Sequence, residues 1–248
     1  MKRTAIFAHL IFTTILSGCA ALTQSATPQD AERVRAAAAR YEAKGVKNLG
    51  ATSSNRIALR PGQWVAMLSQ TKSDPNDITL QVMKVASVSG DTVTIETEQY
   101  GAANQGKRLV MQQRIRNFPV SGQLAYTSDE AAGVIGGIEV VSMRMMDEEG
   151  KVVEMPQLPF QIGRLGSDFV KNNVATGEIR KEQCGNEYYR ASSCYVVPFE
   201  TKVLWMTESG TTYAHSAVPV LGFINSEGDS SRVDVIGFGT SGAQILLR

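Results

Sequence analysis

Histidine would be the most direct indicator of catalysis in this 248-residue chain, and the chain contains two. His9 lies in an N-terminal apolar segment that we expect to be removed, so a Ser-His-Asp triad would depend on His215. His215 stands between Ala214 and Ser216, where a strand is expected to bend. A histidine at such a bend is more often a hydrogen-bonding or surface residue than a base. The Gly-x-Ser-x-Gly elbow of hydrolases is also absent. We therefore expect no catalytic residues and a protein that is not an enzyme.

Other residues that could bind a metal or a phosphate, or take part in catalysis, also lack the partners that such chemistry needs. The acidic stretch Asp147–Glu149 could attract calcium, but an acidic turn is usually only solvated. Glu96 and Glu98 share one face of an expected strand, yet no opposing carboxylates can be placed for glycoside chemistry. The glycine-rich stretch Gly237–Gly242 follows a strand but precedes no helix, so it predicts a turn rather than a phosphate cradle. We expect no metal-binding residues, no cofactor and no cofactor-binding residues.

The N-terminus has the composition of an export signal. Lys2 and Arg3 precede an apolar run from Ala5 to Leu16, as in secretory signal peptides. The run ends in Leu16-Ser17-Gly18-Cys19, which resembles the lipobox of bacterial lipoproteins. The resemblance implies that residues 1–18 form a removable signal peptide. It also implies that Cys19 becomes the mature N-terminus and carries lipid on its sulfur and amino group.

A transmembrane anchor is the alternative interpretation of this segment. Such an anchor needs about 20 consecutive apolar residues. The run here is shorter and is interrupted by His9, Thr13 and Thr14. We therefore favour attachment through acyl chains, in which each buried methylene contributes ~0.8 kcal/mol.

The position after the cysteine and the net charge indicate where the protein acts. Ala20 stands where an aspartate would retain a lipoprotein in the inner membrane, so the resemblance implies a lipid-anchored protein of the Gram-negative outer membrane facing the periplasm. Exposure on the cell surface is left open. Without Lys2 and Arg3, 25 − 2 = 23 basic residues stand against 24 acidic ones, a net charge of −1. This balance predicts no binding to nucleic acid.

The remaining cysteines, Cys184 and Cys194, form an even pair in a chain that we expect to be exported. Such a pair predicts a disulfide. A metal or redox site is the alternative. A Cys-x-x-Cys spacing is absent, however, and His215 is the only histidine outside the N-terminal segment.

The first half of the mature chain predicts a tether, a helix and a run of strands. Residues 19–27 form a lipidated polar tether, and residues 28–45 predict a helix that starts behind Thr27 and stops at Gly45. This helix is rich in alanine and is expected to dock on the surface of the domain or to act as a spacer. From residue 57 onward the apolar period is two, which predicts successive antiparallel strands up to residue 117. In one of these strands, the side chains of Thr92, Thr94 and Glu96 are expected to lie on a solvent-exposed face.

The second half predicts more strands around a short middle helix. One helical turn is expected between Ser128 and Gly133, and the spacing of apolar residues predicts an amphipathic helix between Phe160 and Val174. The expected strands beyond the middle helix are 178–184, 194–206, 211–216, 218–225, 232–238 and 243–247, with residues 208–210 as a turn.

These elements together define a mainly β fold, an antiparallel meander forming a curved sheet or half-open barrel over residues 57–248. The order of anchor, helix, meander, middle helix and further strands is similar in architecture to LolA/LolB-type folds, which hold an acyl chain under a helical lid. We expect a noncatalytic binding or assembly component of the envelope that contacts a protein partner or peptidoglycan. The alternative is a carrier of lipid or of lipoprotein acyl chains in an apolar cavity.

Overall fold

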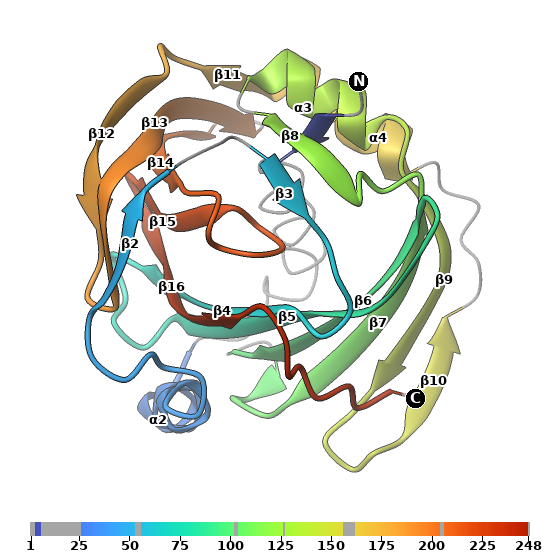
Figure 1. Cartoon of the computed structure of the whole chain (residues 1–248). Helices are drawn as coiled ribbons and strands as arrows, with labels where there is room; N and C mark the ends of the chain where they lie inside the picture. The colour runs from blue at the N-terminus through green and yellow to red at the C-terminus, as the bar shows by residue number, and fades with distance from the viewer. Residues whose placement is uncertain are drawn as a thin grey trace.

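The structure is a computed structural model that describes residues 3–5, 26–52, 56–101, 104–125, 127–155, 162–203 and 206–247. Most of these residues form one strongly curved, mainly antiparallel sheet of 13 strands (Figure 1). The strand order is β10-β9-β7-β6-β5-β4-β16-β15-β14-β13-β11, and β12 and β2 also pair with β13. This arrangement confirms the predicted mainly β fold with an N-terminal helix and a middle helix.

The first half of the sheet is the predicted meander. Its strands are β4 (Trp64–Thr71), β5 (Ile78–Ser89), β6 (Thr92–Tyr100), β7 (Leu109–Arg116), β9 (Glu139–Met146) and β10 (Val152–Met155). Strand β2 (Lys47–Ala51) precedes them in the chain but pairs in parallel with β13 of the second half. The tight turn at residues 90 and 91 joins β5 to β6, and Gly90 has a φ of 60° there, a conformation that glycine adopts without strain.

The second half returns through long strands. These are β11 (Val174–Thr176), β12 (Arg180–Gly185), β13 (Tyr189–Val203), β14 (Met206–Ala214), β15 (Phe223–Gly228) and β16 (Ser231–Gly239). Strand β16 pairs with β4 and thereby joins the two halves into one sheet.

Three predictions for this half were wrong. Residues 208–210 lie inside β14 and do not form a turn. Gly210 is instead required by packing, because a Cβ there would overlap the Phe199 ring and the Glu227 carbonyl. Residues 218–222 form a loop rather than a strand, since Gly222 N bonds back to Val218 O. Residues 243–247 form an extended tail without strand pairing, for the reason given below.

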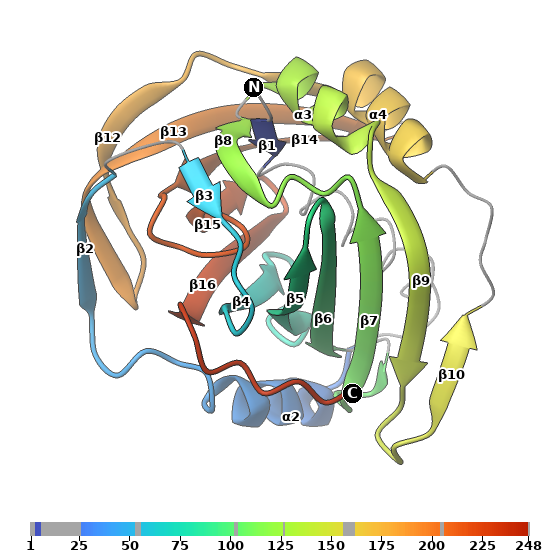
Figure 2. The same cartoon turned by 45° about the vertical axis from the view of Figure 1, so that its right-hand side comes forward.

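Three helices cover different parts of the described sheet. In Figures 1 and 2, α3 (Ser128–Ile135) and α4 (Ile162–Asn173) lie side by side at the top of the molecule, next to β8. Helix α3 continues past Gly133, and Thr127 and Glu130 form its capping box. Helix α2 (Pro28–Ala38) lies on the outer, convex face of the sheet, on the opposite side of the molecule.

Helix α2 is docked on the sheet through its alanine-rich face. Ala31, Val34, Ala37 and Ala38 are buried against a cluster that includes Leu80 of β5. The helix ends at Ala38 rather than at Gly45. The chain leaves the helical path there because Tyr41 turns inward, where its hydroxyl donates a hydrogen bond to Glu98 over 3.0 Å.

The inner, concave face of the sheet holds the larger hydrophobic core. The loop of residues 215–222 between β14 and β15 curls into this interior (Figures 1 and 2). Its Val218, Val220 and Leu221 are buried in the same cluster as Val85 and Ile95 of the sheet. Val220 has a φ of 66°, a strained conformation for a β-branched residue, which the packing around it must stabilise.

A separate small sheet joins β1 (Arg3–Ala5), β8 (Ser121–Ala125) and β3 (Arg56–Ala58). Strand β1 runs parallel to β8. Because β1 belongs to the predicted signal peptide, a mature chain that begins at Cys19 would retain only the β3–β8 pair. The remainder of the signal and the tether up to residue 25, including Cys19, lie outside the described residues.

Candidate functional site on the outer face

A row of polar residues crosses four neighbouring strands on the face that carries α2. Lys84 of β5 is the register partner of Glu96 on β6, and Glu96 is the partner of Gln112 on β7. Gln112 is in turn the partner of Arg144 on β9. We call these four residues the polar row. Lys84, Glu96 and Gln112 are buried, and Glu96 has no exposed surface. The sequence predicted that Glu96 lies on a solvent-exposed face, and in the structure this residue is buried.

The buried ammonium of Lys84 has an acceptor for each of its three protons. Its Nζ lies 3.4 Å from Glu96 Oε1, contacts Glu98 Oε1, and donates to the carbonyl of Gln244 over 2.6 Å. Three acceptors match the three donors of a lysine, which is the condition for keeping this charge out of water.

Two tyrosines complete the environment of Glu98. The hydroxyl of Tyr41 donates to Glu98 Oε1, and the hydroxyl of Tyr100 donates to Glu98 Oε2 over 3.3 Å. Burial and the nearby Glu98 carboxylate raise the pKa of Tyr41 and of Tyr100 above the usual value for a phenol. Both phenols therefore stay protonated and keep donating to the carboxylate at neutral pH.

The C-terminal tail, residues 243–247, lies across the polar row. The amides of Leu246 and Leu247 donate to the Glu96 carboxylate over 2.8–3.0 Å. The carbonyl of Leu247 accepts hydrogen bonds from Gln112 and Arg144. Side chains of the sheet thus satisfy the backbone groups that a neighbouring strand would otherwise satisfy, and so the tail is extended without being a strand.

A pocket of about 410 Å³ opens beside the tail and the C-terminal end of α2. Three aromatic residues and four charged residues line it, together with the tail. They are Arg40, Tyr41, Trp64, Lys84, Glu98, Tyr100, Arg108, Gly242, Ala243, Gln244 and Leu246. The rings of Tyr41 and Trp64 meet with centroids 5.9 Å apart. We call this the outer-face pocket.

Two glycines allow the aromatic residues to lie so close to the sheet. A Cβ at Gly237 would overlap the carbonyl oxygen of Tyr41, and a Cβ at Gly239 would overlap Nε1 of Trp64. The sequence analysis assigned Gly237–Gly242 to a turn. In the structure Gly237 and Gly239 belong to β16, and only residues 240–242 turn. Their role here is close packing.

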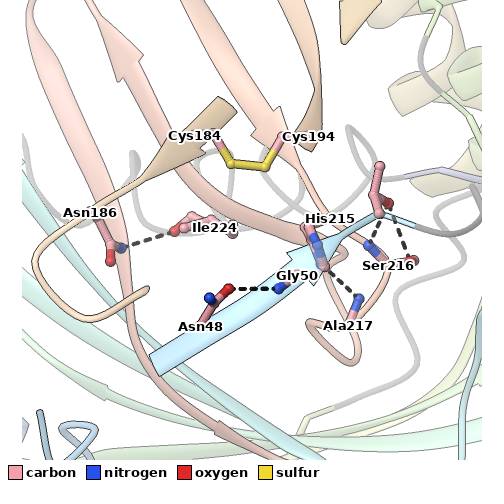
Figure 3. The surroundings of a disulfide bond; sticks show 10 residues. Asn48, Gly50, Cys184, Asn186, Cys194, His215, Ser216, Ala217 and Ile224 are labelled. Carbon is pink, nitrogen blue, oxygen red and sulfur yellow. Dashed lines mark hydrogen bonds between the residues drawn. A yellow bond between two sulfur atoms is a disulfide. The ribbon is translucent and has the colours of Figure 1, made fainter. Parts of the chain in front are cut away.

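His215, the candidate base, lies far along the chain from these groups and faces the interior of the sheet. It is 2% exposed, and burial lowers its pKa, with the Gly50 backbone acting in the opposite direction. Its Nδ1 accepts a hydrogen bond from the amide of Ala217 over 3.1 Å (Figure 3). This places the proton on Nε2, the reverse of the tautomer that a Ser-His-Asp triad needs.

Cys184 and Cys194 form a disulfide near His215, with Cα atoms 5.9 Å apart (Figure 3). The bond joins β12 to β13, and Cys194 is completely buried in the inner core. Both cysteines therefore form a structural cross-link.

The acidic turn is exposed and paired with a lysine. Lys107 Nζ lies 3.3 Å from Glu148 and 4.0 Å from Glu149. Within the described ranges, no cluster of three or more histidine, cysteine, aspartate or glutamate side chains has metal-binding geometry. In the same part of the chain, no helix is long and apolar enough to span a membrane.

Comparisons with known proteins find solved structures with a low level of similarity and show no family. No protein-family model matches the chain, and no curated protein matches it. A Bacteroides fragilis protein that is assigned as exported and has a YmcC-like fold shows 12% identity and a TM-score of 0.34, covering 75% of this chain and 99% of its own.

Two further solved structures are similar at the same level. The Chlamydia trachomatis protein CT021 shows 9% identity and a TM-score of 0.39, covering 75% of this chain and 90% of its own. A Parabacteroides distasonis protein assigned as a lipoprotein shows 9% identity and a TM-score of 0.33, covering 74% of this chain and 97% of its own. None of the three is a LolA or LolB protein, and that resemblance stays a prediction.

Proposed function

We propose that this protein is a lipoprotein held in the outer membrane through Cys19, facing the periplasm, and that it is a noncatalytic binding component of the cell envelope. The lipobox-like residues Leu16–Cys19 support the anchor, and the Cys184–Cys194 disulfide fits an oxidising compartment. The outer-face pocket supports the binding role.

The observation that carries the binding role is how the outer-face pocket is built. The segment that follows helix α2, three strands and the C-terminal tail converge on it, and the buried contacts of Lys84 with Glu96 and Glu98 hold its floor in place. Its lining offers aromatic faces, guanidinium groups and hydroxyls, which are groups that orient a ligand. Among the residues that the structure describes, the lining holds no serine, cysteine or histidine that would act as a nucleophile or a base.

The carrier alternative has less support from the inner face. An acyl chain would need apolar space within the curve of the sheet, and Val218, Val220 and Leu221 of the inserted loop are buried there. Native mass spectrometry of the anchorless protein, purified without detergent, tests this alternative. A copurifying lipid that is retained when Ala243→Trp fills the outer-face pocket would favour the carrier.

Site-specific photocrosslinking in intact cells tests the binding role. A photoreactive residue at position 244, on the exposed rim of the outer-face pocket, is expected to give a discrete adduct. The same residue at the exposed position 202 on β13 is the control and should not give it. Ala243→Trp, which fills the outer-face pocket, should abolish the adduct while the thermal unfolding temperature is retained.

Two results would contradict the proposal. One is an adduct at position 244 that equals the one at position 202 or survives the Ala243→Trp substitution. The other concerns the anchor, because Cys19→Ser should abolish palmitate labelling and release the protein from the membrane. A Cys19→Ser protein that stays membrane-bound at unchanged size would overturn the lipid anchor.

A further inference from the structure

We propose that the outer-face pocket binds an anionic group, a carboxylate or a phosphate, and that Arg40 and Arg108 are the residues that hold it. This inference rests on the proposed binding function and names the chemical class of its ligand.

The first observation is that the side chains of these two arginines lack hydrogen-bond acceptors, whereas the side chains of nearby arginines have them. Within the described residues, the side chains of Arg40 and Arg108 make neither a hydrogen bond nor an ion pair, and Nε of Arg108 is a buried donor without an acceptor. On helix α2, which precedes Arg40, the side chains of Arg33 and Arg35 donate to the backbone carbonyls of Gln105 and Pro75. A buried donor without an acceptor is costly, so an acceptor is expected to bind beside it.

The second observation is the charge around the outer-face pocket. Lys84, Arg40 and Arg108 contribute three positive charges, and Glu96 and Glu98 contribute two negative ones. The carboxylates are already engaged by Lys84, by the tyrosines and by the tail. The charge that is left free is therefore the guanidinium charge, and a single anion would neutralise it.

The third observation is that the two guanidinium groups converge. Arg40 lies just after α2 and Arg108 just before β7, yet both line the same pocket and both oppose the effect of burial on the pKa of Tyr100. A guanidinium presents a planar fork of donors that matches the oxygens of a carboxylate or phosphate. Two such forks on one pocket favour an anion over a neutral or cationic ligand.

The size of the outer-face pocket indicates more than a bare ion. A volume of about 410 Å³ lies in the range of small-molecule sites. Trp64 and Tyr41 form an aromatic wall beside the arginines, against which the body of the ligand can pack. The expected ligand is thus an organic molecule or a lipid headgroup that carries the anionic group.

Tryptophan fluorescence of the full chain in a neutral detergent tests this. The chain has two tryptophans, so Trp205→Phe leaves Trp64 of the outer-face pocket as the reporter. The probes are inorganic phosphate and acetate at constant ionic strength, and phosphatidylglycerol against phosphatidylcholine, each added to the detergent micelles. We expect a saturable change with phosphate, acetate or phosphatidylglycerol, and none with phosphatidylcholine. Calorimetric titration of the unsubstituted chain checks that Trp205→Phe has not created the response.

Substitutions assign the response to the arginines. Arg108→Gln should weaken binding at least tenfold, and Arg108→Lys should weaken it less because the charge remains. Arg190→Gln, at an exposed position on β13, is the matched control and should bind as the parent does. A response to phosphatidylglycerol alone identifies a headgroup, and one to phosphate or acetate identifies a free anion.

The proposal is overturned if none of the three anionic probes gives a response, or if Arg108→Gln and Arg40→Gln both bind like the parent. A crosslinked adduct at position 244 together with no anion binding would retain the binding function and reject its anionic ligand.

Discussion

Lys84 and Glu96 face each other across the β5–β6 pair at positions that are 3% and 0% exposed, with Nζ and Oε1 3.4 Å apart. Burying a charge is costly unless every polar atom finds a partner. Here Glu98 and the C-terminal tail supply the missing partners. The ion pair, the tail and the floor of the outer-face pocket should therefore behave as one unit.

Glu96→Gln should lower the free energy of unfolding by about 3 kcal/mol, since it removes one partner of a buried ion pair. Urea denaturation followed by circular dichroism measures this. Glu139→Gln is the matched control, because Glu139 pairs with Arg116 at the exposed surface and its loss should cost less than about 1 kcal/mol. Equal losses in the two variants would show that Glu96 is not a buried partner of Lys84.

The amides of Leu246 and Leu247 should exchange slowly with solvent, because Glu96 accepts hydrogen bonds from both. Hydrogen exchange measured by NMR should show protection there and much less at the exposed Gln244. Glu96→Gln should reduce that protection at least tenfold while leaving the amide of Ile95 in β6 protected. A tail that exchanges freely in the parent protein would contradict its docking.

Replacing both Cys184 and Cys194 by alanine should lower the free energy of unfolding by about 2.5 kcal/mol, as expected for a loop of ten residues. Thermal and urea unfolding with and without dithiothreitol measure the effect. The reductant should destabilise the parent by a similar amount and leave the double variant unchanged. A parent insensitive to reduction under unfolding conditions would argue against the cross-link.

Stability should fall in mild acid because of His215. Burial lowers the pKa of His215 in the folded state, whereas the unfolded imidazole titrates near pH ~6.5. Below that pH the unfolded chain binds a proton that the folded chain does not. The contribution to stability is therefore complete above pH ~6.5 and is lost as the pH falls towards the folded pKa, by at most ~1.4 kcal/mol per pH unit.

His215→Asn isolates this effect, because an asparagine oxygen can still accept from the Ala217 amide. Urea unfolding at pH 7.5 and 5.5 should show a smaller difference for the variant than for the parent. His215 is the only histidine beyond His9, so no other imidazole contributes once the signal is removed. An unchanged pH dependence would place the titration elsewhere.

The strands of the meander could be predicted because their information is local. The apolar period of two predicted successive strands from residue 57 to residue 117, and β4, β5, β6 and β7 lie within that range. The burial of Glu96 could not be predicted in this way. Its cover comes from the tail, about 150 residues further on, and the alternation of β6 is the same whether the polar side faces water or protein. The available signal was Lys84, a charge within the apolar run Val82–Val85.

The other differences have the same origin. Gly210 was assigned to a turn because glycine is typical of turns, but Phe199 and Glu227 of neighbouring strands require it inside β14. Residues 243–247 have the alternation of a strand, and only the side chains of the polar row explain why they pair differently. A glycine or an apolar run therefore predicts a local conformation, while its partners decide its role.

In the proposed lipoprotein, the short stretch between Cys19 and helix α2 would confine the outer-face pocket to the vicinity of the bilayer. Nine residues, 19–27, reach at most about 30 Å, and the 11-residue helix adds ~16 Å before Arg40. A molecule in the same leaflet would meet the lipidated protein by diffusion in two dimensions, at an effective concentration that a dissolved molecule does not reach. A modest intrinsic affinity would then suffice to occupy the outer-face pocket on the membrane. Lengthening the segment of residues 19–27 would reduce that occupancy without altering any contact in the pocket.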